Sequence, residues 1–214
     1  MRLYFIRHGE TDWNRERRMQ GMVDIPLNEK GRMLAEITAK QLSRIPFDLI
    51  ISSPLCRAIE TARIVTGHAD IPLQVDERIR ELSWGDWEGL TQTDLRQMGY
   101  KDGLNQFFSD PFLFPCPPGG ESIQQLCQRG KQFFEEIAGD PALQDKTILV
   151  STHGAAMRGV LNHLYEDSGN FWQGKVPANC AVTILDVNNG SARFVARDQI
   201  YYDPQLKEEF YKPE

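Results

Sequence analysis

The segment Arg7-His8-Gly9-Glu10 combines a side chain that can act as a nucleophile with one that binds anions. Histidine attacks through an unprotonated ring nitrogen, and a partner on the other nitrogen fixes its tautomer. The planar fork of arginine donates two hydrogen bonds to a phosphate. Gly9 has no Cβ and allows a close approach of backbone. We interpret this segment as a phosphotransfer centre, with His8 as the nucleophile.

Two later segments repeat this layout. Ser53-Pro54-Leu55-Cys56-Arg57 and Ser151-Thr152-His153-Gly154 each follow an apolar run and open a predicted helix. If the three runs are neighbouring strands, Arg57 and His153 converge on His8 at one edge of a sheet. Helix N-termini add backbone donors there. The sequence therefore predicts a local site for a phosphate group on a chain that is acidic as a whole.

A leaving alkoxide also needs a proton, which a buried carboxyl can supply. The stretch 80–89 holds three candidates, Glu81, Asp86 and Glu88. Their spacing alone does not choose among them.

Apolar runs and helical patterns alternate along most of the chain. Ser53-Pro54 has the composition of a helix cap followed by proline, and Ser122 with Gln125 fits a capping box. This alternation predicts a three-layer α/β/α sandwich with a mainly parallel, mixed sheet, and such folds bind ligands at the carboxyl ends of their strands. The predicted strands are 3–6, 47–52, 71–75 and 147–151. Helices are predicted at 28–44, 53–66 and 154–165, and another begins after residue 122. A β-hairpin is predicted from 180–187 and 192–197, with its turn at 188–190.

The segment 84–120 is rich in aromatic residues and ends in a Pro-Gly run at 115–120. Two interpretations stay open for its residues 100–114: a packing segment under a loop, or a lid on the leaving-group side of the site. We expect one domain over residues 1–214, with 84–120 as a cap or insertion.

Bulk properties restrict the partners. The net charge is −6, which disfavours nucleic acid and anionic membranes. The apolar run near residue 3 is too short for a signal segment, so we expect a cytoplasmic protein. The four cysteines form no C-x-x-C pair and are expected to be reduced. A zinc site of His8, His153 and a carboxylate is disfavoured because the local spacing does not support it and two arginines would repel the cation.

At these residues the chain resembles the histidine phosphatase superfamily, also called the phosphoglycerate mutase-like family. Five motifs in family order carry the resemblance. They are Arg7 to Thr11 with Trp13-Asn14, Ser53 to Ala62, Glu81 with Gly85 to Gly89, Gly120-Glu121-Ser122, and Thr152-His153-Gly154.

The resemblance implies a role for each matched residue. His8 would be the phosphorylated nucleophile, and Arg7, Arg57 and His153 would complete the phosphate pocket. Glu81 matches the family's proton donor. Asn14 and Gln20 match positions that touch the phosphate in some members. The resemblance implies a phosphoglycerate mutase-like fold, a small phosphomonoester as substrate, and neither metal nor cofactor.

The short stretch between Glu81 and His153 favours the small phosphatase branch, which includes broad-specificity and α-ribazole phosphatases. Cofactor-dependent mutases of the family carry a longer one. Two alternatives stay open: a 2,3-bisphosphoglycerate-dependent phosphoglycerate mutase, and a non-catalytic phospholigand-binding protein. The sequence names no particular phosphomonoester. It also leaves the oligomeric state open, with a homodimer as one option.

Overall fold

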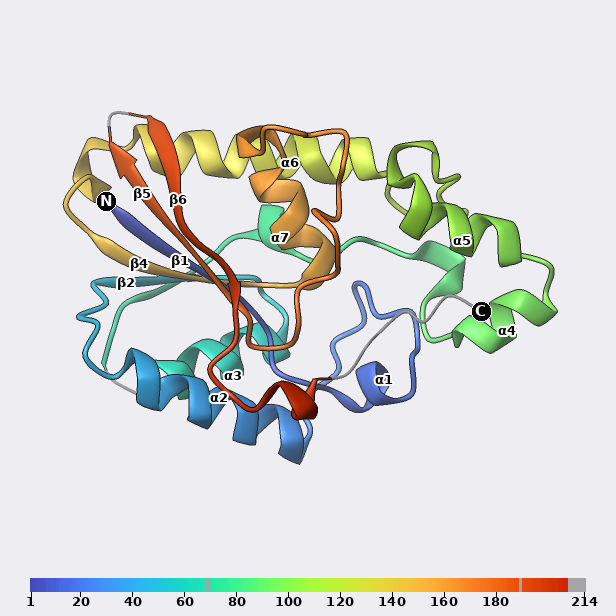
Figure 1. The fold of residues 1–214 in the computed structure, drawn as a ribbon, viewed down its shortest axis with the longest axis horizontal. Coiled ribbons are helices and arrows are strands. Elements are labelled where there is room, and N and C mark those ends of the chain that lie inside the picture. Colours follow the sequence, from blue (N-terminus) through green and yellow to red (C-terminus); the bar gives the residue numbers. More distant parts are fainter. Residues whose placement is uncertain (68–69, 189, 208–214) are drawn as a thin grey trace.

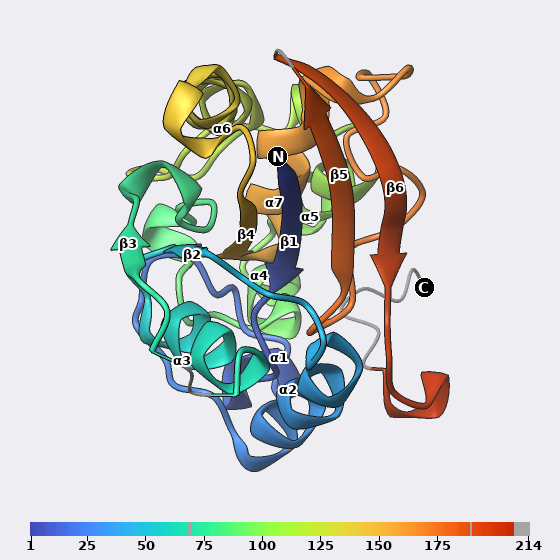
Figure 2. The same cartoon turned by 90° about the vertical axis from the view of Figure 1, so that its left-hand side faces the viewer.

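A six-stranded sheet forms the centre of the computed structural model, which describes residues 1–67, 70–188 and 190–207. Its strand order is β3-β2-β4-β1-β5-β6 (Figure 2). The strands β3, β2, β4 and β1 are parallel, and β5 is antiparallel to both of its neighbours, β1 and β6. This confirms the mainly parallel, mixed sheet. The strands are β1 (Arg2–Arg7), β2 (Leu49–Ser52), β3 (Leu73–Val75), β4 (Thr147–Thr152), β5 (Val182–Asn188) and β6 (Ser191–Gln199).

Helices cover both faces of the sheet, as expected for a three-layer sandwich. Figure 1 shows α6 (Ile123–Gly139) and α7 (Gly154–Leu161) on one side and α2 (Glu29–Leu42) and α3 (Cys56–Val65) on the other. The side chains of β1 alternate between the two layers: Leu3 and Phe5 pack with α6 and α7, whereas Tyr4 and Ile6 pack with α2 and α3. A strand covered on both faces is apolar throughout, which explains the continuous run 3–6.

Local signals place two of these helices correctly. The Asn28 side chain accepts a hydrogen bond from Gly31 N at 2.8 Å and caps α2. The predicted Ser122–Gln125 capping box opens α6. The predicted start of α3 is wrong, because the helix begins at Cys56 and no side chain caps it. The Ser53 hydroxyl bonds instead to His153, in the site described below.

The segment 84–120 contains α4 (Gln92–Gln97) and α5 (Lys101–Ser109), which lie beyond the carboxyl ends of β1 and β4 together with α1 (Asp12–Arg15) (Figure 1). Phe107 and Phe114 are buried in a hydrophobic cluster that also contains Leu126 of α6 and Phe171. Single 3₁₀ turns lie at Glu77–Ile79, Gly85–Trp87, Pro111–Leu113, Pro141–Leu143, Asn162–Leu164 and Pro204–Leu206.

The predicted β-hairpin is present as β5 and β6, while its turn residue Asn189 lies outside the described residues. Within the described ranges, no helix has the length and apolar character that a membrane crossing requires.

Candidate active site

Strand register brings the three predicted segments to one edge of the sheet. The strands β2, β4 and β1 are adjacent, with Arg7 opposite Thr152 and Ser52 opposite Ser151. His8, Ser53 and His153 each follow directly after one of these strands. The neighbouring strands that the sequence required are therefore present. The pocket at this edge has five polar lining residues, Arg7, His8, Asn14, Gln20 and Glu81.

His8 is held in one tautomer. Its Nδ1 lies 2.6 Å from the carbonyl oxygen of Gly9. Because a carbonyl can only accept, Nδ1 carries the proton and Nε2 has the free lone pair of a nucleophile. Burial and the charges of Arg57 and Arg7 lower the pKa of His8 well below its usual 6.5. The ring is therefore neutral at neutral pH.

The glycine after His8 serves helix packing. A Cβ on Gly9 would lie 2.6 Å from the carbonyl oxygen of Gly31 in α2. The close backbone approach expected at Gly9 is therefore present, and its partner is the first turn of α2.

His153 and Arg57 lie beside His8 and are both fully buried. The ring centroids of His8 and His153 are 5.1 Å apart. Arg57 Nε donates to His153 Nδ1 at 3.3 Å, so His153 carries its proton on Nε2 and donates to Ser53 Oγ at 2.8 Å. Burial, Arg57 and His8 lower the pKa of His153 well below its usual 6.5. Neither His153 nor Arg57 is part of the pocket lining.

Backbone carbonyls of the 21–23 loop hold the Arg57 guanidinium. Its Nη2 donates to Gly21 O at 2.7 Å and its Nη1 to Val23 O at 2.8 Å. Burial lowers the pKa of Arg57 to about 10, which leaves it cationic at neutral pH. The Glu88 carboxylate accepts from the N–H groups of Met22 and Val23 and so steadies the same loop.

Arg7 and Gln20 bring unsatisfied donors to the pocket. Arg7 Nη1 donates to Pro177 O at 2.5 Å, but its Nε is buried without a partner among the described residues. Gln20 Nε2 is also buried without a partner among the described residues, while Gln20 Oε1 accepts hydrogen bonds from Thr11 and Asn14. Buried donors are normally paired. Two of them in one pocket suit an anionic ligand.

Of the three acid candidates, Glu81 is the one that lines the pocket. Its Oε1 accepts from Leu82 N and Ala156 N, both at 2.9 Å, and its Oε2 from Ala155 N at 3.2 Å. The last two donors belong to the first turn of α7. Asp86 is exposed, and Glu88 is engaged by the 21–23 loop.

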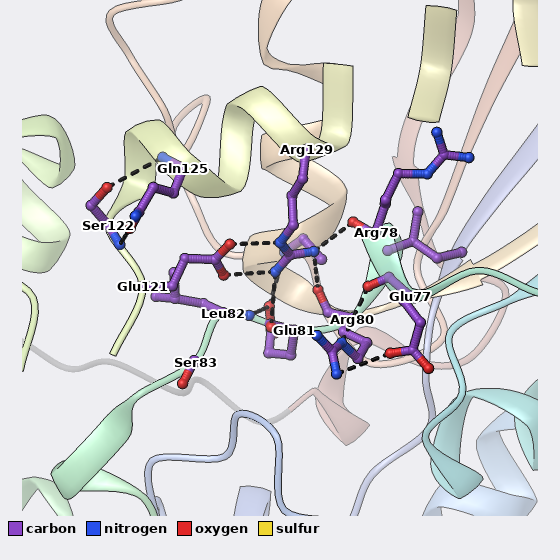
Figure 3. Close-up of polar contacts among 12 residues, drawn as sticks. Glu77, Arg78, Arg80, Glu81, Leu82, Ser83, Glu121, Ser122, Gln125 and Arg129 are labelled. Atoms are coloured by element: carbon purple, nitrogen blue, oxygen red, sulfur yellow. Dashed lines mark hydrogen bonds and ion pairs between the residues drawn. The ribbon is translucent and has the colours of Figure 1, made fainter. Parts of the chain in front are cut away.

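An arginine of α6 holds the backbone around Glu81 (Figure 3). Arg129 donates to the carbonyls of Arg78, Arg80 and Glu81 at 2.5, 2.8 and 3.0 Å. Glu121 binds the same guanidinium through both carboxylate oxygens, at 2.6 and 2.7 Å. The Gly120-Glu121-Ser122 motif is thereby connected to the backbone that carries Glu81.

We expect Arg129→Met to lower kcat by about 10- to 100-fold, because small displacements of a catalytic group are costly. KM should change less than kcat, since the Arg129 side chain is not among the residues that line the pocket. Steady-state kinetics checks this, with Tm measured alongside. Arg80→Met is the matched control, because it breaks an exposed pair with Glu77 on the same segment and leaves the Arg129 contacts. Equal losses of kcat in the two variants would contradict the prediction.

The buried histidines also predict the pH dependence of stability. His8 and His153 have lowered pKa values in the folded chain, so the unfolded chain binds more protons just below pH 6.5. The free energy of unfolding should therefore decrease as the pH is lowered below about 6.5, by up to ~1.4 kcal/mol per pH unit for each histidine. Urea unfolding between pH 5 and 7.5 measures this slope. His153→Gln should reduce it, and an unchanged slope would count against a neutral, buried His153.

Sequence reasoning missed Asn179. Its Nδ2 donates to the His8 carbonyl at 3.0 Å and to Asn14 Oδ1 at 3.3 Å. Asn179 belongs to none of the recognised motifs. A signal was nevertheless available, because β5 runs antiparallel to β1 and so begins at the edge where β1 ends.

Across the part of the chain that the structure describes, no group of three or more His, Cys, Asp or Glu side chains is placed to hold a metal. The four cysteines are free thiols; Cys180 is buried and Cys116 is exposed.

Two neutral histidines, two arginines and a carboxyl at the strand ends of a three-layer α/β fold are typical of enzymes that handle phosphoryl groups. The chain belongs to the histidine phosphatase superfamily (branch 1), whose family model matches residues 3–199. This superfamily contains both phosphatases and mutases.

Relatives of both kinds are similar to this chain. A 2,3-bisphosphoglycerate-dependent phosphoglycerate mutase 2 from Gloeobacter violaceus is 32% identical, covering 76% of this chain and 74% of the relative. A phosphoserine phosphatase 1 from Hydrogenobacter thermophilus is 31% identical, covering 80% of each.

Solved structures support the fold. The structure of Bacillus stearothermophilus YhfR has a TM-score of 0.86 and 36% identity, covering 93% of this chain and 97% of that one. An alpha-ribazole phosphatase from Shigella flexneri has a TM-score of 0.81 and 26% identity, covering 93% and 96%.

Proposed function

We propose that the protein hydrolyses a small phosphomonoester through a phosphohistidine formed on His8. One observation carries the proposal: the Gly9 carbonyl fixes the proton on Nδ1 of a neutral, buried His8 that lines the same pocket as Arg7 and Gln20. Such a histidine has a free Nε2 lone pair without any change of protonation.

In the first step, Arg7 and Gln20 bind the phosphoryl oxygens, assisted by Asn14. His8 Nε2 attacks phosphorus in line, the N–P bond forms and the ester P–O bond breaks. Arg57 supplies positive charge beside the transferring group. The Nε2–H of His153, which donates to Ser53 Oγ here, would turn from that hydroxyl to the same oxygens. Glu81 donates a proton to the leaving oxygen, which departs as an alcohol.

In the second step, water attacks the phosphohistidine. The Glu81 carboxylate, now without its proton, takes one from that water. The N–P bond breaks, the electron pair returns to His8 Nε2, and inorganic phosphate leaves. The two steps restore every group to its starting state.

The mutase is the main alternative, since similar relatives carry that name. Hydrolysis is favoured by the short stretch between Glu81 and His153. A panel of phosphorylated metabolites, assayed for phosphate release with and without 2,3-bisphosphoglycerate, tests the choice. We expect phosphate release that needs no bisphosphate. Slow release together with strong stimulation by the bisphosphate would favour a mutase. Tight phosphate binding without turnover would favour the non-catalytic alternative.

We further propose one domain over residues 1–214, in which 84–120 forms a cap over the site, acting in the cytoplasm on a small molecule. The contact of Phe107 and Phe108 with the pocket supports this role of the cap.

A further inference from the structure

A buried ion pair outside the pocket lining joins helix α7 to the end of strand β6. Arg158 lies in α7 and is fully buried, and Asp198 lies in β6, the outer strand of the sheet (Figure 2). The carboxylate accepts two hydrogen bonds from the guanidinium, from Nη1 to Oδ1 at 3.2 Å and from Nη2 to Oδ2 at 2.5 Å. Burial lowers the pKa of Arg158, but Asp198 and Tyr165 raise it by more, so the guanidinium is cationic.

An irregularity in β6 presents Asp198 to this partner. Register shifts between β5 and β6 place Arg197 and Asp198 opposite Thr183 alone, which is a β-bulge. Asp198 has a φ of +50°, in the left-handed region that residues other than glycine rarely adopt. The Thr183 hydroxyl accepts from Asp198 N at 3.1 Å and supports this conformation. A bulge of this kind redirects a side chain from the regular alternation of a strand.

The same guanidinium holds the segment that precedes β5. Arg158 Nη2 also donates to the carbonyl oxygen of Lys175 at 2.9 Å. Two residues further along the chain, Pro177 O accepts from Arg7 Nη1 at 2.5 Å. A Cβ on Gly154, the first residue of α7, would lie 3.5 Å from Arg7 Nε. Arg158 therefore ties together the two elements that Arg7 contacts, α7 and the 175–177 segment.

Stability does not account for a buried ion pair of this kind. The free energy lost when two charges leave water is about as large as the attraction returns, and apolar residues of similar volume often stabilise a fold as well. The cost is increased here, because Arg158 Nε is buried without a partner among the described residues. The planar fork of arginine supplies a fixed geometry at Lys175 O, which an apolar side chain would not.

We propose that Arg158 and Asp198 are positioning residues that orient Arg7, through the 175–177 segment, toward the phosphoryl group. This inference rests on the proposed role of Arg7 in binding that group. Arg7 is the one arginine among the described residues that line the pocket. Its orientation should therefore set both the affinity for phosphate and kcat/KM.

The test removes both charges together in Arg158→Met/Asp198→Asn, which leaves neither charge unpaired and should fold. We expect kcat/KM for 4-nitrophenyl phosphate to fall about tenfold, and the Kd for inorganic phosphate, measured by calorimetry, to rise about tenfold. Arg2→Met/Asp186→Asn is the matched control, because it removes a bidentate pair between β1 and β5 that is partly exposed. Its values should stay within about twofold of the parent. Equal losses in the two double variants would contradict the inference.

A cycle with Arg7→Met separates positioning from a general structural role. If Arg158 and Asp198 act through Arg7, removing them should cost less than about twofold in kcat/KM once Arg7 is methionine. A tenfold loss in both backgrounds would overturn the inference, and so would the absence of a loss in the parent background.

Arg158→Lys keeps the inference testable if the double variant does not fold. Lysine retains a cation for Asp198, but one ammonium cannot reproduce the fork that also holds Lys175 O. We expect a folded protein by Tm and a fall in kcat/KM of about three- to tenfold. A parental kcat/KM would contradict the inference. If the parent released no phosphate from 4-nitrophenyl phosphate, the proposed hydrolase would be wrong, and the Kd for inorganic phosphate would still test the positioning.

Discussion

His8→Ala is expected to lower turnover of phosphomonoesters by about 10,000-fold or more, because the variant lacks the imidazole on which the proposed covalent intermediate forms. The variant keeps Arg7, Arg57 and Gln20 and should still bind phosphate. The loss should therefore appear in kcat, while the affinity for phosphate, measured by calorimetry, changes little.

The matched control for His8→Ala is His163→Gln. His163 packs on Phe134, with ring centroids 5.2 Å apart, and takes no part in the pocket lining. Its kcat should stay within about threefold of the parent, as is usual for a change remote from a site. If His8→Ala retained more than about 1% of parental turnover, covalent catalysis by this residue would be wrong.

Glu81→Gln should show a loss that depends on the leaving group. A poor alkoxide leaving group needs the proton that Glu81 supplies, so kcat for an alkyl phosphate should fall by about 100- to 10,000-fold. 4-Nitrophenyl phosphate has a good leaving group and needs no such proton in the first step. The glutamine variant should therefore release a rapid burst of nitrophenol, followed by slow turnover, because it cannot activate water.

Asp86→Asn is the control for the acid assignment. Asp86 is exposed and lies five residues beyond Glu81 in the same motif region. Its activity should match the parent with both substrates. A large loss in Asp86→Asn with little loss in Glu81→Gln would transfer the acid role away from Glu81.

The parts of the site that follow from strand ends were predictable from the sequence. An apolar run followed by Arg7-His8, and another followed by His153, places both histidines at one sheet edge once the strands are parallel neighbours. Asn28 and Ser122 also marked helix starts correctly, because a capping side chain bonds to backbone only two or three residues away.

The parts that depend on contacts distant in sequence were not predictable. Ser53 had the composition of a helix cap, yet its hydroxyl bonds to His153, which is 100 residues away. Arg57 is held by backbone carbonyls of the 21–23 loop. Every residue has such a carbonyl, so the sequence does not indicate which ones bind Arg57. Trp172 lines the pocket and packs on Phe107 from a segment without a recognised motif. Such pairings are set by tertiary packing rather than by local pattern.

Rapid-quench labelling tests the phosphohistidine on His8 most directly. The protein would be mixed with a phosphomonoester, quenched within milliseconds in alkali, and analysed by peptide mass spectrometry. We predict an acid-labile phosphoryl group on His8, formed at a rate no slower than turnover, absent from His8→Ala and accumulated in Glu81→Gln with 4-nitrophenyl phosphate. Phosphorylation of His153 or Ser53 in place of His8, or full turnover in His8→Ala, would contradict this mechanism.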